Sequence, residues 1–109
     1  MKLVEWAGDS RSAVKAFPAT VRQEIGYQLG RVQEGLEPSD WKPMEGIGAS
    51  VREIRVRDAA GAFRVVYVAK FSAAVFVLHA FQKKTPRTAK RDIDLAASRY
   101  KEIAKEQRK

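Results

Sequence analysis

Positively charged side chains gather in residues 51–84, where valine, tyrosine and phenylalanine separate them. The residues concerned are Arg55, Arg57, Arg64, Lys83 and Lys84. Guanidinium groups stay protonated and match the geometry of a phosphate. A lysine among other cations can release its proton, because neighbouring positive charge lowers its pKa. These residue types therefore predict a site that binds a phosphodiester and moves protons on it.

The same stretch is typical of three β-strands joined by short turns. The expected strands are residues 51–58, 62–71 and 74–81. In the first strand, Ile54 and Val56 alternate with arginines, as on a half-buried strand. Asp and Gly in residues 58–61 favour a turn, and residues 72–73 are short enough for a tight hairpin. We therefore expect a three-stranded antiparallel meander.

A meander would bring the cations to one end of the sheet. Arg55 and Arg57 share one side of the first strand, since they are two residues apart. Arg64 would lie back across the first turn, close to the end of that strand. The third strand returns toward the same end, so Lys83 and Lys84 would meet the arginines there. The predicted site is a cationic pocket with apolar walls.

Other kinds of catalytic site find little support in the sequence. The chain has one histidine, His79, and no cysteine, which excludes a Cys/His pair and a typical zinc site. Asp92 and Asp94 are two residues apart on an expected helix and would point to different faces. Residues 46–48 lack the rest of any phosphate-binding glycine loop. No metal and no cofactor are expected, and His79 remains an alternative proton carrier.

The rest of the chain supplies the elements that would support this sheet. We expect a short strand in residues 1–6, a short helix ending at Phe17, a helix in residues 19–33, a loop in residues 36–50 and a final helix in residues 89–107, with Thr88 as its N-cap. The predicted fold class is α+β. It is one domain, residues 1–109, in which an antiparallel sheet packs against two N-terminal helices and carries a C-terminal helix.

Charge is distributed unevenly along the 109 residues, whose formal net charge is +8. Residues 1–50 hold six Lys or Arg and seven Asp or Glu, whereas residues 51–109 hold fifteen and six. A basic half of this kind favours a polyanionic partner, although a solvated basic surface without a partner remains an alternative. No apolar run is long enough to span a membrane, and no signal peptide is evident, so a cytoplasmic protein is expected.

Three segments resemble the RelE/ParE toxin superfamily, in particular its HigB-like, phage-derived branch. They are WKPMEGIG, VREIRVRDAAGAFRVVYV and VLHAFQKKT. The resemblance is stronger from Trp41 to the end of the chain than in residues 6–35. It implies that Arg55, Arg64, Lys83 and Lys84 are the functional cations. Two departures stand out, because Glu53 occupies a position where some members carry a cation, and no clear equivalent of their C-terminal tyrosine lies near Lys90.

The resemblance implies a toxin of a type II toxin–antitoxin system that cleaves messenger RNA in the ribosomal A site without a metal. A ParE-type inhibitor of DNA gyrase and a non-catalytic RNA-binding relic are the alternatives. In the nuclease hypothesis, Arg64 holds the scissile phosphate, Arg55 stabilises its charge, and Lys83 or Lys84 moves protons. The candidate RNA-binding residues are Arg57, Lys42, His79, Arg87 and Lys90. The implied partner is a helix-turn-helix antitoxin, with a toxin–antitoxin heterotetramer as one assembly.

Overall fold

A five-stranded sheet with helices on both faces forms the structure, a computed structural model that describes residues 1–108. In chain order the elements are β1 (Leu3–Trp6), α1 (Ser10–Lys15), α2 (Ala19–Gln33), β2 (Trp41–Pro43), β3 (Val51–Asp58), β4 (Gly61–Val68), β5 (Ala74–Lys83) and α3 (Lys90–Gln107). The strands lie in the order β1-β5-β4-β3-β2. The predicted α+β class, with two N-terminal helices and a C-terminal helix, is confirmed.

The predicted meander is present in β3, β4 and β5, which pair antiparallel in sequence order. The edge strand β1 differs from the predicted antiparallel sheet, because it runs parallel to β5. No hairpin turn joins these two strands. The chain between them forms two helices and three strands, so local turn chemistry does not set their relative direction.

A further strand, β2, lies within residues 36–50, where the sequence predicted only a loop. Trp41 pairs with Ile54, and Pro43 pairs with Arg52, both antiparallel. The proline and glycine residues around β2 favoured a loop, but an edge strand tolerates proline, since one side of it pairs with no neighbour. β2 adds Lys42 to the sheet.

The β4–β5 turn is longer than the two-residue hairpin turn predicted from the sequence. β4 ends at Val68 rather than at residue 71, and β5 begins at Ala74. The ammonium group of Lys2 donates hydrogen bonds to the carbonyl oxygens of Ala69 and Phe71, the latter at 2.8 Å. The Lys2 side chain therefore satisfies two backbone carbonyl groups of this turn.

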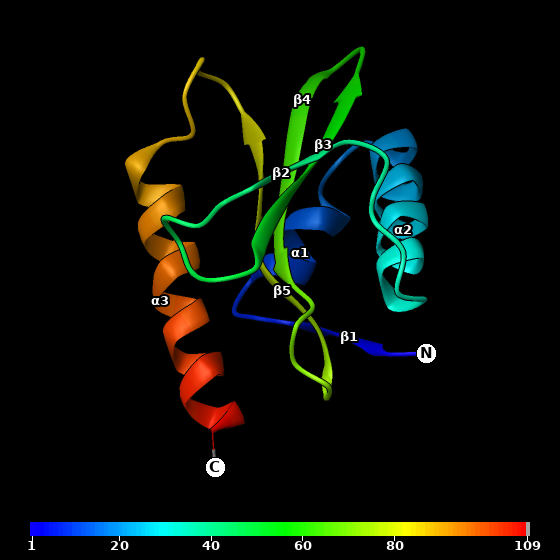
Figure 1. Cartoon of the computed structure of the whole chain (residues 1–109). Helices are drawn as coiled ribbons and strands as arrows, with labels where there is room; N and C mark the ends of the chain where they lie inside the picture. Colours follow the sequence, from blue (N-terminus) through cyan, green and yellow to red (C-terminus); the bar gives the residue numbers. More distant parts are fainter. Residues whose placement is uncertain (109) are drawn as a thin grey trace.

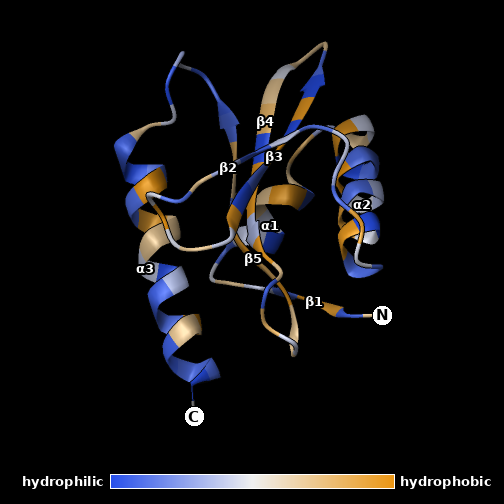
Figure 2. Cartoon of the chain, viewed as in Figure 1, coloured by the Kyte–Doolittle hydropathy of each residue, from blue (hydrophilic) through white to orange (hydrophobic). Residues whose placement is uncertain are grey.

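Helices lie on both sides of the sheet (Figure 1), and each face of the sheet carries its own hydrophobic core. On one face the apolar stripe of α2 packs on the central strands; its members are Val21, Ile25, Leu29 and Val32. On the other face Ala96 and Ile103 of α3 pack on Val66 and Val68 of β4. Figure 2 shows hydrophilic and hydrophobic residues alternating along β3, whereas the helices carry long polar stretches. We call the second face the α3 face.

The final helix begins one residue later than predicted. Its N-cap is Ala89, which makes no side-chain cap hydrogen bond, and the predicted N-cap Thr88 donates its hydroxyl to Glu53 instead. None of the helices in residues 1–108 combines the length and the apolar character that crossing a bilayer requires.

Candidate functional site

Arginines from two neighbouring strands meet on the α3 face. Arg55 of β3 lies directly opposite Arg64 of β4, and the side chains of such a pair point to the same side of the sheet. Two residues away, Glu53 lies opposite Val66, which belongs to the core beneath α3. The alternation of the strands therefore places both arginines on the α3 face.

Three further cations lie beside this pair, one of them on β3 and two on the strands that flank β3 and β4. In the next row of the sheet, Ala62 separates Arg57 on β3 from Lys83 on β5. On the other side, Lys42 of β2 lies opposite Glu53, and its Nζ is 3.9 Å from the Glu53 Oε1. We call these residues the cationic cluster: Lys42, Arg55, Arg57, Arg64 and Lys83. Four strands contribute to it, which no linear segment of the sequence would reveal.

Arg64 is the most deeply placed member of the cationic cluster, with 4% of its surface exposed. Its Nη1 donates a hydrogen bond of 3.0 Å to the Phe63 carbonyl oxygen, and its Nε lies 3.4 Å from the Glu53 Oε1. Burial lowers the pKa of Arg64, and the negative charge of Glu53 opposes that effect. Since an arginine stays protonated over the physiological range, Arg64 is a fixed positive charge beneath the surface.

Lys83 occupies an environment that suits a proton acceptor. Partial burial lowers the pKa of its ammonium group, and the charges of Arg64 and Lys42 lower the pKa further. Glu53 acts in the opposite direction. Lys84 is exposed and lies just past the end of β5. The structure thus places Lys83, rather than Lys84, within the cationic cluster.

An open depression of about 340 Å³ adjoins the cationic cluster, between the end of β5 and the start of α3. Its lining residues are Phe81, Gln82, Lys83, Lys84, Thr85, Ala89, Arg91 and Asp92. Lys83 belongs to both the cationic cluster and the depression. A strand of nucleic acid lodged there would pass basic side chains from β5 and from α3.

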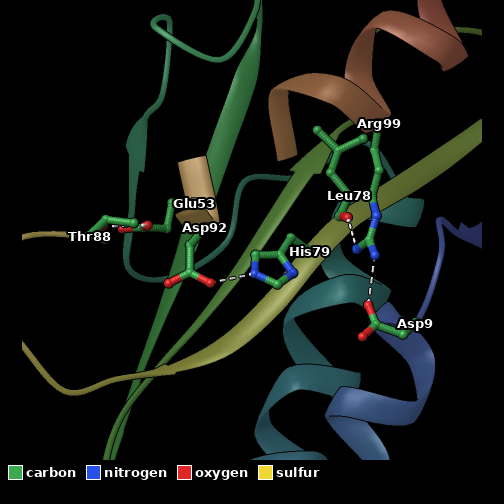
Figure 3. A network of polar contacts seen from close by, with 7 residues as sticks. All are labelled: Asp9, Glu53, Leu78, His79, Thr88, Asp92 and Arg99. Carbon is green, nitrogen blue, oxygen red and sulfur yellow. Dashed lines mark hydrogen bonds and ion pairs between the residues drawn. The ribbon is translucent and has the colours of Figure 1, made fainter. Parts of the chain in front are cut away.

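His79, a candidate RNA contact and alternative proton carrier in the sequence, lies outside the cationic cluster and contacts α3. Its surface is 8% exposed, and its Nε2 lies 2.7 Å from the Asp92 Oδ1 on α3 (Figure 3). The ring stacks on Phe81 with 5.1 Å between centroids. A β-bulge next to His79 shifts the strand register at this point. His79 therefore fastens α3 to the sheet.

The remaining predicted contacts lie outside the cationic cluster. Arg87 is exposed in the segment between β5 and α3. Lys90 is exposed at the start of α3, where its Nζ is 3.0 Å from the Asp94 Oδ2. Tyr67, three residues after Arg64, is buried in the core on the opposite face, and burial raises the pKa of its hydroxyl. Tyr67 is therefore a core residue on the face opposite the cationic cluster.

Glu53 and Thr88 are components of the site that sequence reasoning did not assign. The Glu53 side chain is fully buried and joins contacts from three other parts of the chain: Lys42, Arg64 and Thr88 (Figure 3 shows the last). The available signal was the strand alternation, which puts this acidic side chain on the same face of the strand as Val51 and Arg55. In residues 1–108 no three His, Asp or Glu side chains are grouped so that they could hold a metal ion.

Two comparisons with known proteins agree with this architecture. Residues 12–101 match the family described as "Phage derived protein Gp49-like (DUF891)". The chain is also similar in structure to a double arginine-to-alanine mutant of the E. coli toxin RelE in the free state, with 16% identity and a TM-score of 0.64. That similarity covers 94% of this chain and 97% of the other. No relative among curated proteins matches the chain.

The family match extends over most of the sequence and includes each member of the cationic cluster. The structural match, at its low identity, establishes the fold, which is that of RelE. The chain therefore belongs to the phage-derived Gp49-like family, a family of RelE/HigB-type toxins.

Proposed function

We propose that this protein is the toxin of a type II toxin–antitoxin system and that it cleaves messenger RNA on the ribosome, with the cationic cluster as its active site. The observation that carries the proposal is the direct pairing of Arg55 with Arg64, two residues along the sheet from Lys83. Opposed like charges destabilise a sheet, and one buried acid, Glu53, faces the five cations of the cluster, so a ligand of opposite charge is the simplest reason for keeping the excess positive charge. A phosphodiester meets that need.

The reaction would proceed by attack of the ribose 2′-oxygen on the neighbouring phosphorus. Neutral Lys83 accepts the proton of the 2′-hydroxyl, while Arg64 and Arg55 hold the non-bridging oxygens, where negative charge accumulates. The bond from phosphorus to the 5′-oxygen breaks, and that oxygen takes up a proton. Lys84, at the edge of the depression, is the candidate donor. The products are a 2′,3′-cyclic phosphate and a 5′-hydroxyl.

The proposed partners follow from the family and from the charge of the site. RelE-like toxins act with an antitoxin, for which a helix-turn-helix protein is proposed here, and a toxin–antitoxin heterotetramer is one assembly. An acidic segment of the antitoxin would complement the cationic cluster. The ribosome would present the messenger RNA in its A site, with Lys42 and Arg57 at the flanks of the scissile phosphate.

Cleavage by purified protein on ribosomes stalled at a defined codon tests the proposal. Arg64→Ala and Lys83→Ala are each expected to slow cleavage by at least about 100-fold, since each removes a group that acts in the transition state. Arg11→Ala and Lys15→Ala are matched controls, because both residues are exposed on α1, across the sheet from the α3 face. Full cleavage by both site variants, with normal folding, would refute the assignment. Arrest of DNA replication before translation would favour a gyrase inhibitor instead.

A further inference from the structure

Glu53 is a buried acid at the centre of a site otherwise built from cations. Its side chain has no exposed surface, and its Oε1 lies near both Arg64 and Lys42. Its Oε2 accepts a hydrogen bond of 3.5 Å from the Thr88 hydroxyl. A carboxylate is costly to bury, so its presence here requires a compensating interaction.

The geometry shows a charge interaction rather than a tight structural ion pair. Charge-assisted hydrogen bonds between guanidinium and carboxylate groups usually measure about 2.7–2.9 Å. The Arg64 Nε and the Glu53 Oε1 are 3.4 Å apart, and both atoms are buried without a hydrogen-bond partner in residues 1–108. Glu53 therefore acts on Arg64 mainly through its field.

That field extends beyond Arg64. Glu53 lies 3.9 Å from the Lys42 ammonium group and also offsets part of the positive potential at Lys83. Three members of the cationic cluster thus share one negative neighbour. An RNA phosphate approaching from the surface would be attracted by the cations and repelled by the carboxylate beneath them.

We propose that Glu53 is a built-in counter-charge that weakens the hold of the cationic cluster on RNA. The inference rests on the proposed function, because it assumes that RNA binds at this cluster. Glu53 is a positioning residue in this account, since it touches Arg64 and Lys42 rather than the RNA. Its effect is to keep binding weak enough for release of the cleaved strand.

The test measures the affinity of the full chain for a 2′-O-methyl RNA oligonucleotide, which has no free 2′-hydroxyl and cannot be cleaved. Glu53→Gln removes the charge while keeping the shape and a carbonyl acceptor. We expect its Kd at low salt to be about tenfold smaller than that of the wild type. The dependence of log Kd on log salt concentration should become steeper by up to about 0.7, the value of one further phosphate contact on single strands. A merely structural role would not steepen this dependence.

Glu5→Gln is the matched control, because it changes the net charge equally from an exposed position on β1. It should bind as the wild type does. Glu53→Met provides a second neutral variant, and circular dichroism with thermal unfolding shows which variants fold. Unchanged or weaker binding by a folded Glu53 variant would overturn the inference. So would failure of both variants to fold, since the carboxylate would then be required for folding.

Arg64→Ala separates this inference from the proposed function. If Arg64→Ala binds the oligonucleotide as tightly as the wild type, RNA does not bind at the cationic cluster and the proposed function fails. If Arg64→Ala weakens binding while Glu53→Gln leaves it unchanged, only the role of Glu53 is lost.

Discussion

Arg55 and Arg64 lie directly opposite each other on β3 and β4, with both side chains on the α3 face of the sheet. Like charges in this relation destabilise a sheet. The protein therefore carries a small structural cost at the place where its proposed chemistry occurs. Replacing a residue that favours function over stability should raise the stability of the protein and lower its activity.

Replacement of Arg55 is expected to stabilise the fold and to slow RNA cleavage. Arg55→Thr removes the repulsion and places a good strand former on β3, so the free energy of unfolding should rise by about 0.5 kcal/mol. Cleavage on ribosomes should fall by about 10- to 100-fold, because a charge that stabilises the transition state is lost. Urea unfolding and a cleavage assay on the same preparation check both changes. A destabilised variant with normal cleavage would contradict the role of Arg55.

Lys83 should give the cleavage rate a characteristic pH dependence. Its pKa lies below the usual lysine value, and only its neutral form can accept a proton. Below that pKa the neutral fraction rises about tenfold for each pH unit, so the single-turnover rate should rise with pH in the same proportion. Lys83→Arg should abolish this rise and slow cleavage at least about 100-fold. A rate that rises equally in wild type and Lys83→Arg would show that another group is the base.

The pH dependence of the cleavage rate should also be measured for Lys84→Ala. Lys84 is the candidate donor for the leaving oxygen, so its replacement should lower the rate while leaving the rise with pH in place. Loss of the rise in Lys84→Ala would exchange the roles of the two lysines.

His79 is expected to matter for stability rather than for cleavage. His79→Gln breaks the contact with Asp92, and both side chains are largely buried. The loss of this partly buried contact should lower the free energy of unfolding by about 1–2 kcal/mol. Cleavage measured well below the unfolding temperature should change by no more than about twofold. A large loss of cleavage in a folded His79→Gln protein would return His79 to the list of catalytic candidates.

Asp9 and Arg99 couple the stability of the protein to pH. The Arg99 Nη2 lies 2.8 Å from the Asp9 Oδ1, and this contact lowers the pKa of the carboxyl group below 3.8 (Figure 3). A carboxyl group with a lowered folded pKa stabilises the protein above pH 3.8, and this contribution disappears as the pH falls through the folded pKa. Asp9→Asn should therefore melt at a lower temperature at neutral pH and lose less stability on acidification.

Thermal unfolding at several pH values, with Ser12→Ala as an exposed α1 control, checks this expectation. Parallel melting curves for Asp9→Asn and wild type across the acid range would show that the contact contributes nothing to stability.

The sequence predicted best the elements whose signals are local. The bounds of β3 and α2 follow from alternation and from a helical stripe, and both match the structure. β2 escaped prediction because its three residues, which include Pro43, are too few to show a periodicity of their own. The direction of β1 escaped it as well, since that depends on how distant segments pack.

In the candidate site, too, contacts set by a local turn could be predicted, whereas contacts between distant segments could not. The meeting of Arg55 with Arg64 follows from a hairpin register, which the turn at residues 58–61 fixes locally. The convergence of Lys42 and Thr88 on Glu53 involves β2 and the segment before α3, which the sequence does not relate to each other. The contact of His79 with Asp92 was not predictable either, because a lone histidine on a strand gives no indication of which helix will cover it.

Primer extension on a defined messenger RNA in purified stalled ribosomes tests the central claim most directly. The wild-type protein should cut the message within the A-site codon, Arg11→Ala should match it, and Arg64→Ala should be at least about 100-fold slower. Equal cutting by folded Arg64→Ala and wild-type protein, or no cutting by the wild type, would contradict the assignment of the cationic cluster as a ribosome-dependent ribonuclease site.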